Sequence, residues 1–215
     1  MIVTRIGNPS RTGSRAVYAK AEGERTQKVA TLNDQALADL RIEPGVAWTD
    51  RLAAKAQQAS GMLAARRDAF RMIGARAVSR QRLIDRLRRK GHDATLAASV
   101  ADEFVARGLI DDAAFAAVVA ASASRRAGKR LVESKLRARG IDRVTAARAS
   151  VDAAKERDAL EDALTLGRGR LKRMSDRLTP DAKRRRLYGA LARRGYDSDV
   201  CRTVVERLMR PGDDD

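Results

Sequence analysis

The stretch Arg82-Leu83-Ile84-Asp85-Arg86-Leu87-Arg88-Arg89-Lys90-Gly91 decides the fold, because its pattern returns twice further along the chain. The related stretches are residues 131–140 and 186–195, and the three glycines lie 49 and 55 residues apart. Each glycine has Leu or Val eight residues before it, Leu four before it, Lys or Arg directly before it, and Asp two after it. This spacing falls within the range of helical repeat units, so the sequence predicts tandem repeats.

The shared pattern describes a helix, a stop and a second helix. Apolar residues at minus eight and minus four lie on one helix face. A basic residue in the last turn suits the negative end of the helix dipole. The glycine can adopt the left-handed conformation that ends a helix, and the Asp that follows can cap the next one. Each repeat therefore contains at least two helices, joined at Gly91, Gly140 or Gly195.

A further helix precedes each pair, which gives nine helices in three triplets. The predicted helices cover residues 62–77, 111–126 and 156–177, and Gly167 and Gly169 are weak points in the last of them. Ser79 is a plausible cap for the next helix of the first triplet. Thr179-Pro180 has the cap and first-turn proline of a helix start. The predicted repeats span residues 49–110, 111–155 and 156–210, followed by an acidic tail at 211–215.

The first 48 residues differ from the rest and predict a small β-rich module. Residues 3–6, 15–19 and 28–32 are short β-compatible runs separated by turn residues. Asn33 can cap one short helix before Pro44-Gly45 breaks the chain. The module holds too few large apolar residues to be stable alone, so we expect it to dock onto the helical part. The fold class is therefore mainly α, with this β-rich module in front.

The composition favours helices and a basic surface. The 215 residues include 45 Lys and Arg against 28 Asp and Glu, a formal net charge of +17, and most of the excess lies beyond residue 60. Partners rich in phosphate or carboxylate are attracted to such a surface. Aromatic residues make up only 3% of the chain, which disfavours a large all-β domain. One cysteine and no long apolar run predict a reduced, soluble protein of the cytoplasm.

Residues that carry catalysis are scarce, so the sequence predicts a protein that is not an enzyme and needs no cofactor or metal. The single histidine, His92, has the position of Ile141 and Tyr196 in the other repeats, which favours a half-buried packing role. The single cysteine, Cys201, aligns with small residues and is predicted to lie in the core. Asp111 and Asp112 follow Gly108-Leu109-Ile110 and are interpreted as helix caps.

The string Gly108-Leu109-Ile110-Asp111-Asp112-Ala113-Ala114-Phe115-Ala116, with Arg125, Gly128, Leu136 and Gly140 after it, resembles the RecX family of recombination regulators. Residues 79–91 fit the same family pattern, and the resemblance covers roughly residues 62–210. The front module is similar to the extension of longer family members. One departure is the apolar pair Val118-Val119, where the family tends to show an aromatic and a basic residue.

The resemblance implies a non-enzymatic regulator that binds RecA and its filament on single-stranded DNA. Such proteins modulate, and most often inhibit, filament growth, ATPase, strand exchange and coprotease activity in recombinational repair and the SOS response. We expect a monomer that touches RecA, and DNA directly as a further option, through a basic face. The candidate contact residues are Lys90, Arg125, Arg126, Lys129, Arg130, Arg139, Arg184, Arg185, Arg186 and Arg194.

An alternative is a direct nucleic-acid-binding protein, either architectural or a helix-turn-helix regulator. The charge of +17 and the Asp-capped helices favour it. The scarcity of aromatic residues, which stack on single-stranded bases, argues against it. The salt dependence of binding distinguishes the two hypotheses. The affinity for bare DNA falls steeply between about 50 and 200 mM salt, whereas the affinity for a filament held partly by protein contacts should fall less.

Overall fold

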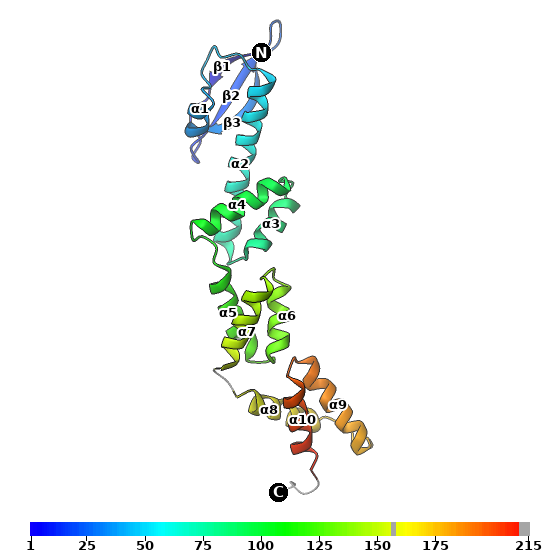
Figure 1. Cartoon of the computed structure of the whole chain (residues 1–215). Helices are drawn as coiled ribbons and strands as arrows, with labels where there is room; N and C mark the ends of the chain where they lie inside the picture. Colours follow the sequence, from blue (N-terminus) through cyan, green and yellow to red (C-terminus); the bar gives the residue numbers. More distant parts are fainter. Residues whose placement is uncertain (156–157, 211–215) are drawn as a thin grey trace. The chain divides into compact units, whose positions relative to one another are not determined.

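A computed structural model of the chain describes residues 1–155 and 158–210 and shows a mainly α fold with a small antiparallel sheet at the N-terminal end (Figure 1). The strands are β1 (Ile2–Ile6), β2 (Ser14–Lys20) and β3 (Gln27–Asn33). The helices are α1 (Asp34–Asp39), α2 (Asp50–Ala75), α3 (Arg80–Arg89), α4 (Ala94–Ala106), α5 (Asp112–Ser124), α6 (Lys129–Arg137), α7 (Arg143–Lys155), α8 (Ala159–Leu171), α9 (Pro180–Arg193) and α10 (Ser198–Leu208). The predicted triplets are α2–α4, α5–α7 and α8–α10.

The sheet has the order β1-β2-β3, with antiparallel neighbours and a core that includes Val17, Leu32 and Trp48. The outer edge of β1 is closed by the chain before α2, where the Val3 N–H donates to the Val46 carbonyl at 2.9 Å. Asn33 caps α1 as predicted, because its side chain accepts the Ala36 N–H. All three predicted β runs are therefore strands, each slightly longer than the sequence suggested.

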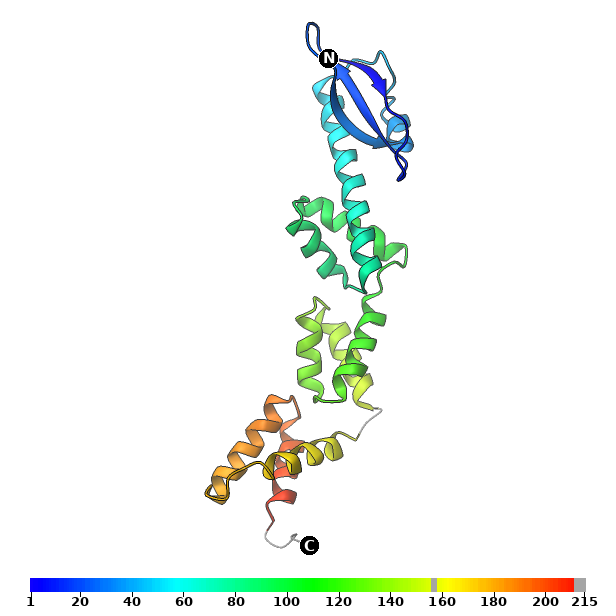
Figure 2. The same ribbon diagram turned by 180° about the vertical axis from the view of Figure 1, so that it is seen from behind.

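Helix α2 begins at Asp50, so the predicted start at residue 62 is wrong. The Thr49 side chain accepts the Leu52 N–H and caps the helix there, and no proline interrupts the helix that follows. The first half of α2 then runs beside the sheet, as Figure 2 shows from behind, and buries Ala56 in the core that the sheet forms. The β-rich module therefore docks onto the helical part, as expected, and it does so by packing against the first half of α2.

The chain divides into two compact units. One comprises Met1–Arg76 and Leu83–Leu109, and the other comprises Ala77–Arg82 with the chain from Ile110 onward. Residues Ala77–Arg82, which include the first residues of α3, thus belong to the second unit, whereas the rest of α3 belongs to the first. The division of the chain at the repeat boundaries 49, 111 and 156 stays a prediction.

The three glycines of the repeat end their helices as the sequence indicates. Gly91, Gly140 and Gly195 have φ angles of +95°, +81° and +82°, in the left-handed region that an L side chain rarely adopts. The apolar residues eight and four positions before them are all buried to 1% exposure or less, and they are Leu83, Leu87, Val132, Leu136, Leu187 and Leu191. Each repeat therefore buries one helix face and stops the helix at glycine.

Helix α8 is shorter than predicted. It starts after the cap Asp158 and ends at Leu171, whereas the sequence suggested a helix from 156 to 177, of which 156 lies outside the described residues. Gly167 is not a weak point, because a Cβ there would lie 2.6 Å from the Leu208 side chain. The glycine allows α8 and α10 to pack closely. In the part of the chain that the structure describes, no helix has the length and apolar character needed to cross a membrane.

Candidate partner-binding surface

The aspartates that follow the turn glycines start the next helices, but they do so in two ways. Asp93 accepts the N–H groups of Thr95 and Leu96, and Asp142 accepts those of Val144 and Thr145. Hydrogen bonds from the Thr95 and Thr145 side chains, together with those from the backbone N–H groups, hold the pKa of both carboxyl groups below the ordinary value. Asp197 is the N-cap residue of α10 but makes no side-chain cap hydrogen bond.

The Asp197 carboxylate instead pairs with Arg130 of α6, at 3.1 Å between Oδ1 and Nε. The expectation that this Asp caps its own helix through its side chain is therefore wrong. The Asp197 carboxylate reaches Arg130 because the turn at Gly195 packs against the beginning of α6. The Arg130 guanidinium provides a charged partner that a lone helix start does not offer.

Backbone hydrogen bonds fix this contact between the Gly195 turn and the start of α6. The Gly128 N–H donates to the Arg194 carbonyl at 2.8 Å, and the Arg130 N–H donates to the Gly195 carbonyl at 3.1 Å. The Arg194 side chain donates back to the Arg126 carbonyl at 2.9 Å. The second and third triplets are thus joined by several hydrogen bonds between a helix start and a glycine turn.

The same kind of contact occurs between the start of α3 and the Gly140 turn, all within the second compact unit. The Ser79 hydroxyl donates to the Arg139 carbonyl at 2.6 Å, and the Arg82 guanidinium donates to the Ala138 carbonyl at 3.0 Å. Ser79 and Gly128 both lie twelve residues before the turn glycine of their own repeat. In both cases the carbonyl directly before the next turn glycine is the acceptor, so the contact repeats with the sequence pattern.

Five of the candidate contact residues come together where the Gly195 turn meets α6. Arg125 and Arg126 end α5, Lys129 and Arg130 begin α6, and Arg194 ends α9. All five are exposed, although Arg130 and Arg194 also hold the junction through the bonds described above. The structure therefore gathers these cations from two triplets, which their positions in the sequence did not require.

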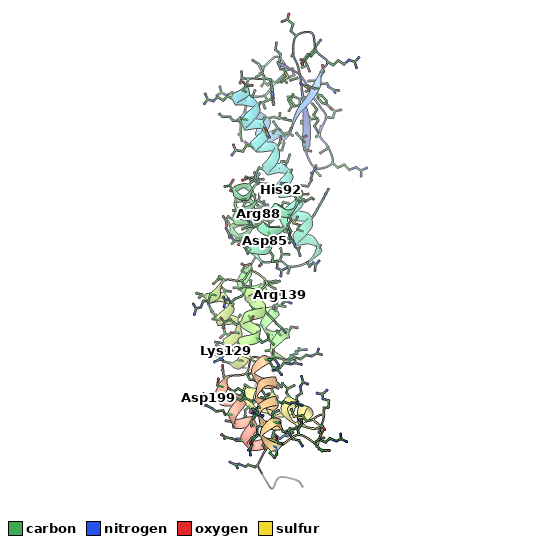
Figure 3. The ribbon with its side chains drawn as sticks, turned by 90° about the vertical axis from the view of Figure 1, so that its right-hand side faces the viewer. Asp85, Arg88, His92, Lys129, Arg139 and Asp199 are labelled. Carbon is green, nitrogen blue, oxygen red and sulfur yellow. The ribbon has the colours of Figure 1, made fainter. Side chains whose placement is uncertain are left out.

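The other five candidates lie elsewhere. Arg139 follows α6 at the end opposite Lys129, as the labelled side chains in Figure 3 show. The remaining members of the set are spread over α9 and the Gly91 turn, and they are Arg184, Arg185, Arg186 and Lys90. Arg184 pairs with Asp181 at 3.3 Å on the same helix, an exposed ion pair of small energetic value.

Lys90 is exposed but forms an ion pair with the buried Asp68, which the sequence did not reveal. Its Nζ lies 2.6 Å from Oδ1 of Asp68 on α2, while Nε2 of His92 lies 2.9 Å from Oδ2 of the same carboxylate. Burial by itself raises the pKa of Asp68, but the hydrogen bonds from Lys90 and His92 outweigh it, and the pKa is lowered. His92 is mostly buried, as predicted, but its contact with Asp68 is polar.

Two further predictions concern Asp111–Asp112 and Cys201. Asp111 caps α5 by accepting the Ala114 N–H, as expected. Asp112 does not cap α5, because its carboxylate accepts the Arg80 N–H at the start of α3 at 2.8 Å. Cys201 is fully buried in the core, as are the aligned Ala97 and Ala146. Among the described residues, no group of three or more His, Cys, Asp or Glu side chains is arranged to hold a metal ion.

Comparison with known proteins gives a consistent family. The chain is 38% identical over 146 residues to the regulatory protein RecX of Mycobacterium avium, covering 65% of this chain and 82% of that protein. It is 37% identical over 151 residues to that of Mycobacterium ulcerans, covering 67% and 84%. The chain belongs to the RecX family. A family model described as the third three-helix domain of RecX matches residues 156–205.

Solved RecX structures show the same fold. A crystal structure of regulatory protein RecX matches with a TM-score of 0.74 at 16% identity, covering 94% of this chain and 98% of that one. RecX from Lactobacillus salivarius matches with a TM-score of 0.57 at 18% identity, covering 69% and 96%. The tandem helical triplets of this chain are therefore the fold found in solved RecX structures, and its relatives are regulatory proteins.

Proposed function

We propose that this RecX-family chain binds the RecA filament on single-stranded DNA and inhibits its growth and ATP hydrolysis. The observation that carries the proposal is the gathering of Arg125, Arg126, Lys129, Arg130 and Arg194 where two triplets join. A filament of protein on DNA offers carboxylates and phosphates, and clustered cations attract both. Membership of the RecX family supports a regulatory role rather than a catalytic one.

The lack of carboxylate partners for three cations of the cluster supports binding to an external partner. Within residues 1–155 and 158–210, the side chains of Arg125, Arg126 and Lys129 form no ion pair with a carboxylate. The hydrogen bonds of Arg130 and Arg194 hold the backbone beneath them, so the unpaired cations project from a fixed junction. A preorganised surface loses less conformational entropy on binding than a flexible one.

RecA ATP hydrolysis on single-stranded DNA is the direct test. We expect the full chain to slow hydrolysis at substoichiometric amounts while hydrolysing no ATP by itself. A rate that stays unchanged at equimolar protein would overturn the proposal. Binding to preformed filaments is expected to weaken less between about 50 and 200 mM salt than binding to bare DNA does, since protein contacts do not release DNA counterions.

Variants of the cluster locate the effect. Replacing Arg125 and Lys129 together by Gln removes two unpaired cations and is expected to reduce inhibition with little change in stability. The matched control replaces Arg143 and Arg148 together by Gln, which removes two exposed cations from α7 outside the candidate set. Equal loss of inhibition in the double variant and the control would show that only net charge matters.

A further inference from the structure

A large groove lies in the first compact unit, between the β2–β3 side of the sheet and α2. Its volume is about 1220 Å³, more than a small-molecule site of roughly 300–1000 Å³ requires. On α2 it is lined by residues that share one helix face, from Ala53 through Gln57, Ser60 and Ala64 to Arg67. At about 1.5 Å per residue, these positions span about 20 Å of helix, so the groove is long enough for an extended chain.

The charge of the groove is positive. Lys28, Arg66, Arg67 and Arg71 line it, whereas no Asp or Glu does so among the described residues. Arg66 is neutralised by Glu103 at 2.7 Å, and Arg71 lies 4.0 Å from Asp68. Lys28 and Arg67 form no ion pair in the described parts of the chain. An anionic ligand is therefore favoured.

An exposed aromatic ring lies among these arginines. Phe70 lines the groove with 45% of its surface exposed, although its ring packs on Phe104 at 4.8 Å between centroids. The Arg107 guanidinium lies 5.8 Å from the Phe70 centroid. An exposed ring surrounded by cations is suited to an unpaired base and its phosphates, because the ring stacks on the base. Bases within a duplex are already stacked and do not offer this contact.

The sheet edge in the groove is closed to a peptide strand. An added strand would bond to the free backbone groups of β3, but the Ser60 hydroxyl accepts the Thr31 N–H at 3.2 Å and donates to the Thr31 carbonyl at 2.9 Å. Both backbone groups at the middle of the edge are thus occupied. Strand addition by an acidic peptide is therefore disfavoured.

We propose that this groove binds single-stranded nucleic acid directly, without RecA. Phe70 stacks on a base, and Lys28 and Arg67 contact phosphates. The site lies apart in the sequence from the cluster proposed for the RecA filament, so either proposal can fail without the other.

The test uses the full chain, no RecA, and a labelled oligothymidylate of about 12 nucleotides, within the ~4–16 nucleotides that single-strand sites cover. Anisotropy of the label measures affinity. Trp48, the single tryptophan of the chain, also lines the groove, so its fluorescence reports binding there and not at the cations of the other unit. We expect oligothymidylate to change Trp48 fluorescence over the concentration range in which anisotropy rises.

Two substitutions separate stacking from charge. Phe70→Leu keeps an apolar side chain against Phe104 but removes the ring, and we expect an affinity loss of at least about fivefold with the salt slope unchanged. Arg67→Gln should lower affinity and reduce the slope of log K against log salt by about 0.7, the value for one phosphate on a single strand. Arg51→Gln, an exposed cation on the same helix outside the groove, is the matched control.

Three results would overturn the proposal. One is an affinity in both groove variants equal to that of Arg51→Gln, with circular dichroism showing that all are folded. Another is displacement of the oligonucleotide by polyglutamate as readily as by unlabelled oligothymidylate, which would indicate a general polyanion site. A third is equal competition by duplex DNA, which would exclude stacking on an unpaired base.

Discussion

Alanine at the turn glycines tests whether the repeats are joined through the Gly195 turn. Gly91 and Gly195 share sequence pattern and left-handed backbone, with φ of +95° and +82°. A Cβ at Gly91 would meet nothing within 4 Å, whereas one at Gly195 would lie 2.6 Å from the Leu131 Cβ and overlap the Leu131 backbone. The two substitutions therefore have the same local strain but different packing.

The expected costs follow from these two contributions. The left-handed backbone costs an alanine about 1–2 kcal/mol, and the stiffer unfolded chain returns about 0.4–1 kcal/mol, so Gly91→Ala should destabilise by about 1 kcal/mol. Gly195→Ala adds an overpacking cost of about 1–3 kcal/mol, for a total of about 2–4 kcal/mol. Gly128→Ala should show the packing cost without the left-handed strain, since its φ is −72° and its Cβ would overlap the Gly195 backbone.

Urea unfolding followed by far-UV circular dichroism measures these costs, and Trp48 fluorescence follows the first unit separately. An unchanged m-value is needed to compare midpoints as stabilities. Gly128 and Gly195 contact each other, so the double variant should cost less than the two single costs added together. Equal destabilisation by Gly91→Ala and Gly195→Ala would refute the reasoning, because local backbone strain alone would then explain both.

Other predictions concern the core, the buried carboxylate of Asp68 and the cysteine. Leu136→Ala should lower the free energy of unfolding by about 2–5 kcal/mol in urea titrations, since the side chain is fully buried, and an unmoved midpoint would contradict this. Because the pKa of Asp68 is lowered on folding, its contribution to stability is complete above the ordinary value of 3.8 and is lost as the pH falls through the lower folded value. As the pH falls through that acid range, the melting temperature of Asp68→Asn should therefore decrease less than that of the wild type. Burial raises the pKa of the Cys201 thiol, so it should react with a thiol reagent only after denaturant is added, and rapid labelling of the folded chain would show that it is accessible.

Much of the helix architecture could be predicted because its signals are local. The left-handed turn at Gly140, the cap at Asn33 and the cap and proline at Thr179-Pro180 each depend on a few neighbouring residues. The buried positions also followed from helical periodicity, as Leu87 shows. The start of α2 was predicted wrongly because the local cap at Thr49 was not used, and contact with the sheet stabilises the added length of helix.

The site depended more on contacts that sequence spacing does not contain. The sequence identified the cations around α6 as candidates, but it gave no sign that Arg130 would hold Asp197 or that Arg194 would bond to the Arg126 carbonyl. The groove beside α2 was also missed. Its residues recur at helical spacing, but that spacing is equally typical of a buried face.

The sequence by itself determined that helices stop at the three turn glycines, which faces those helices bury and that the chain is basic, because hydrogen bonds and strain within a few residues decide the first two properties and composition decides the third. The tertiary structure alone decided the partners of Asp112 and Asp197 and the exposure of Phe70 beside Arg67. A carboxylate at a helix start bonds either to its own N–H groups or to a donor from another repeat, a backbone N–H for Asp112 and a guanidinium for Asp197, and only the packing of the repeats brings that donor within reach.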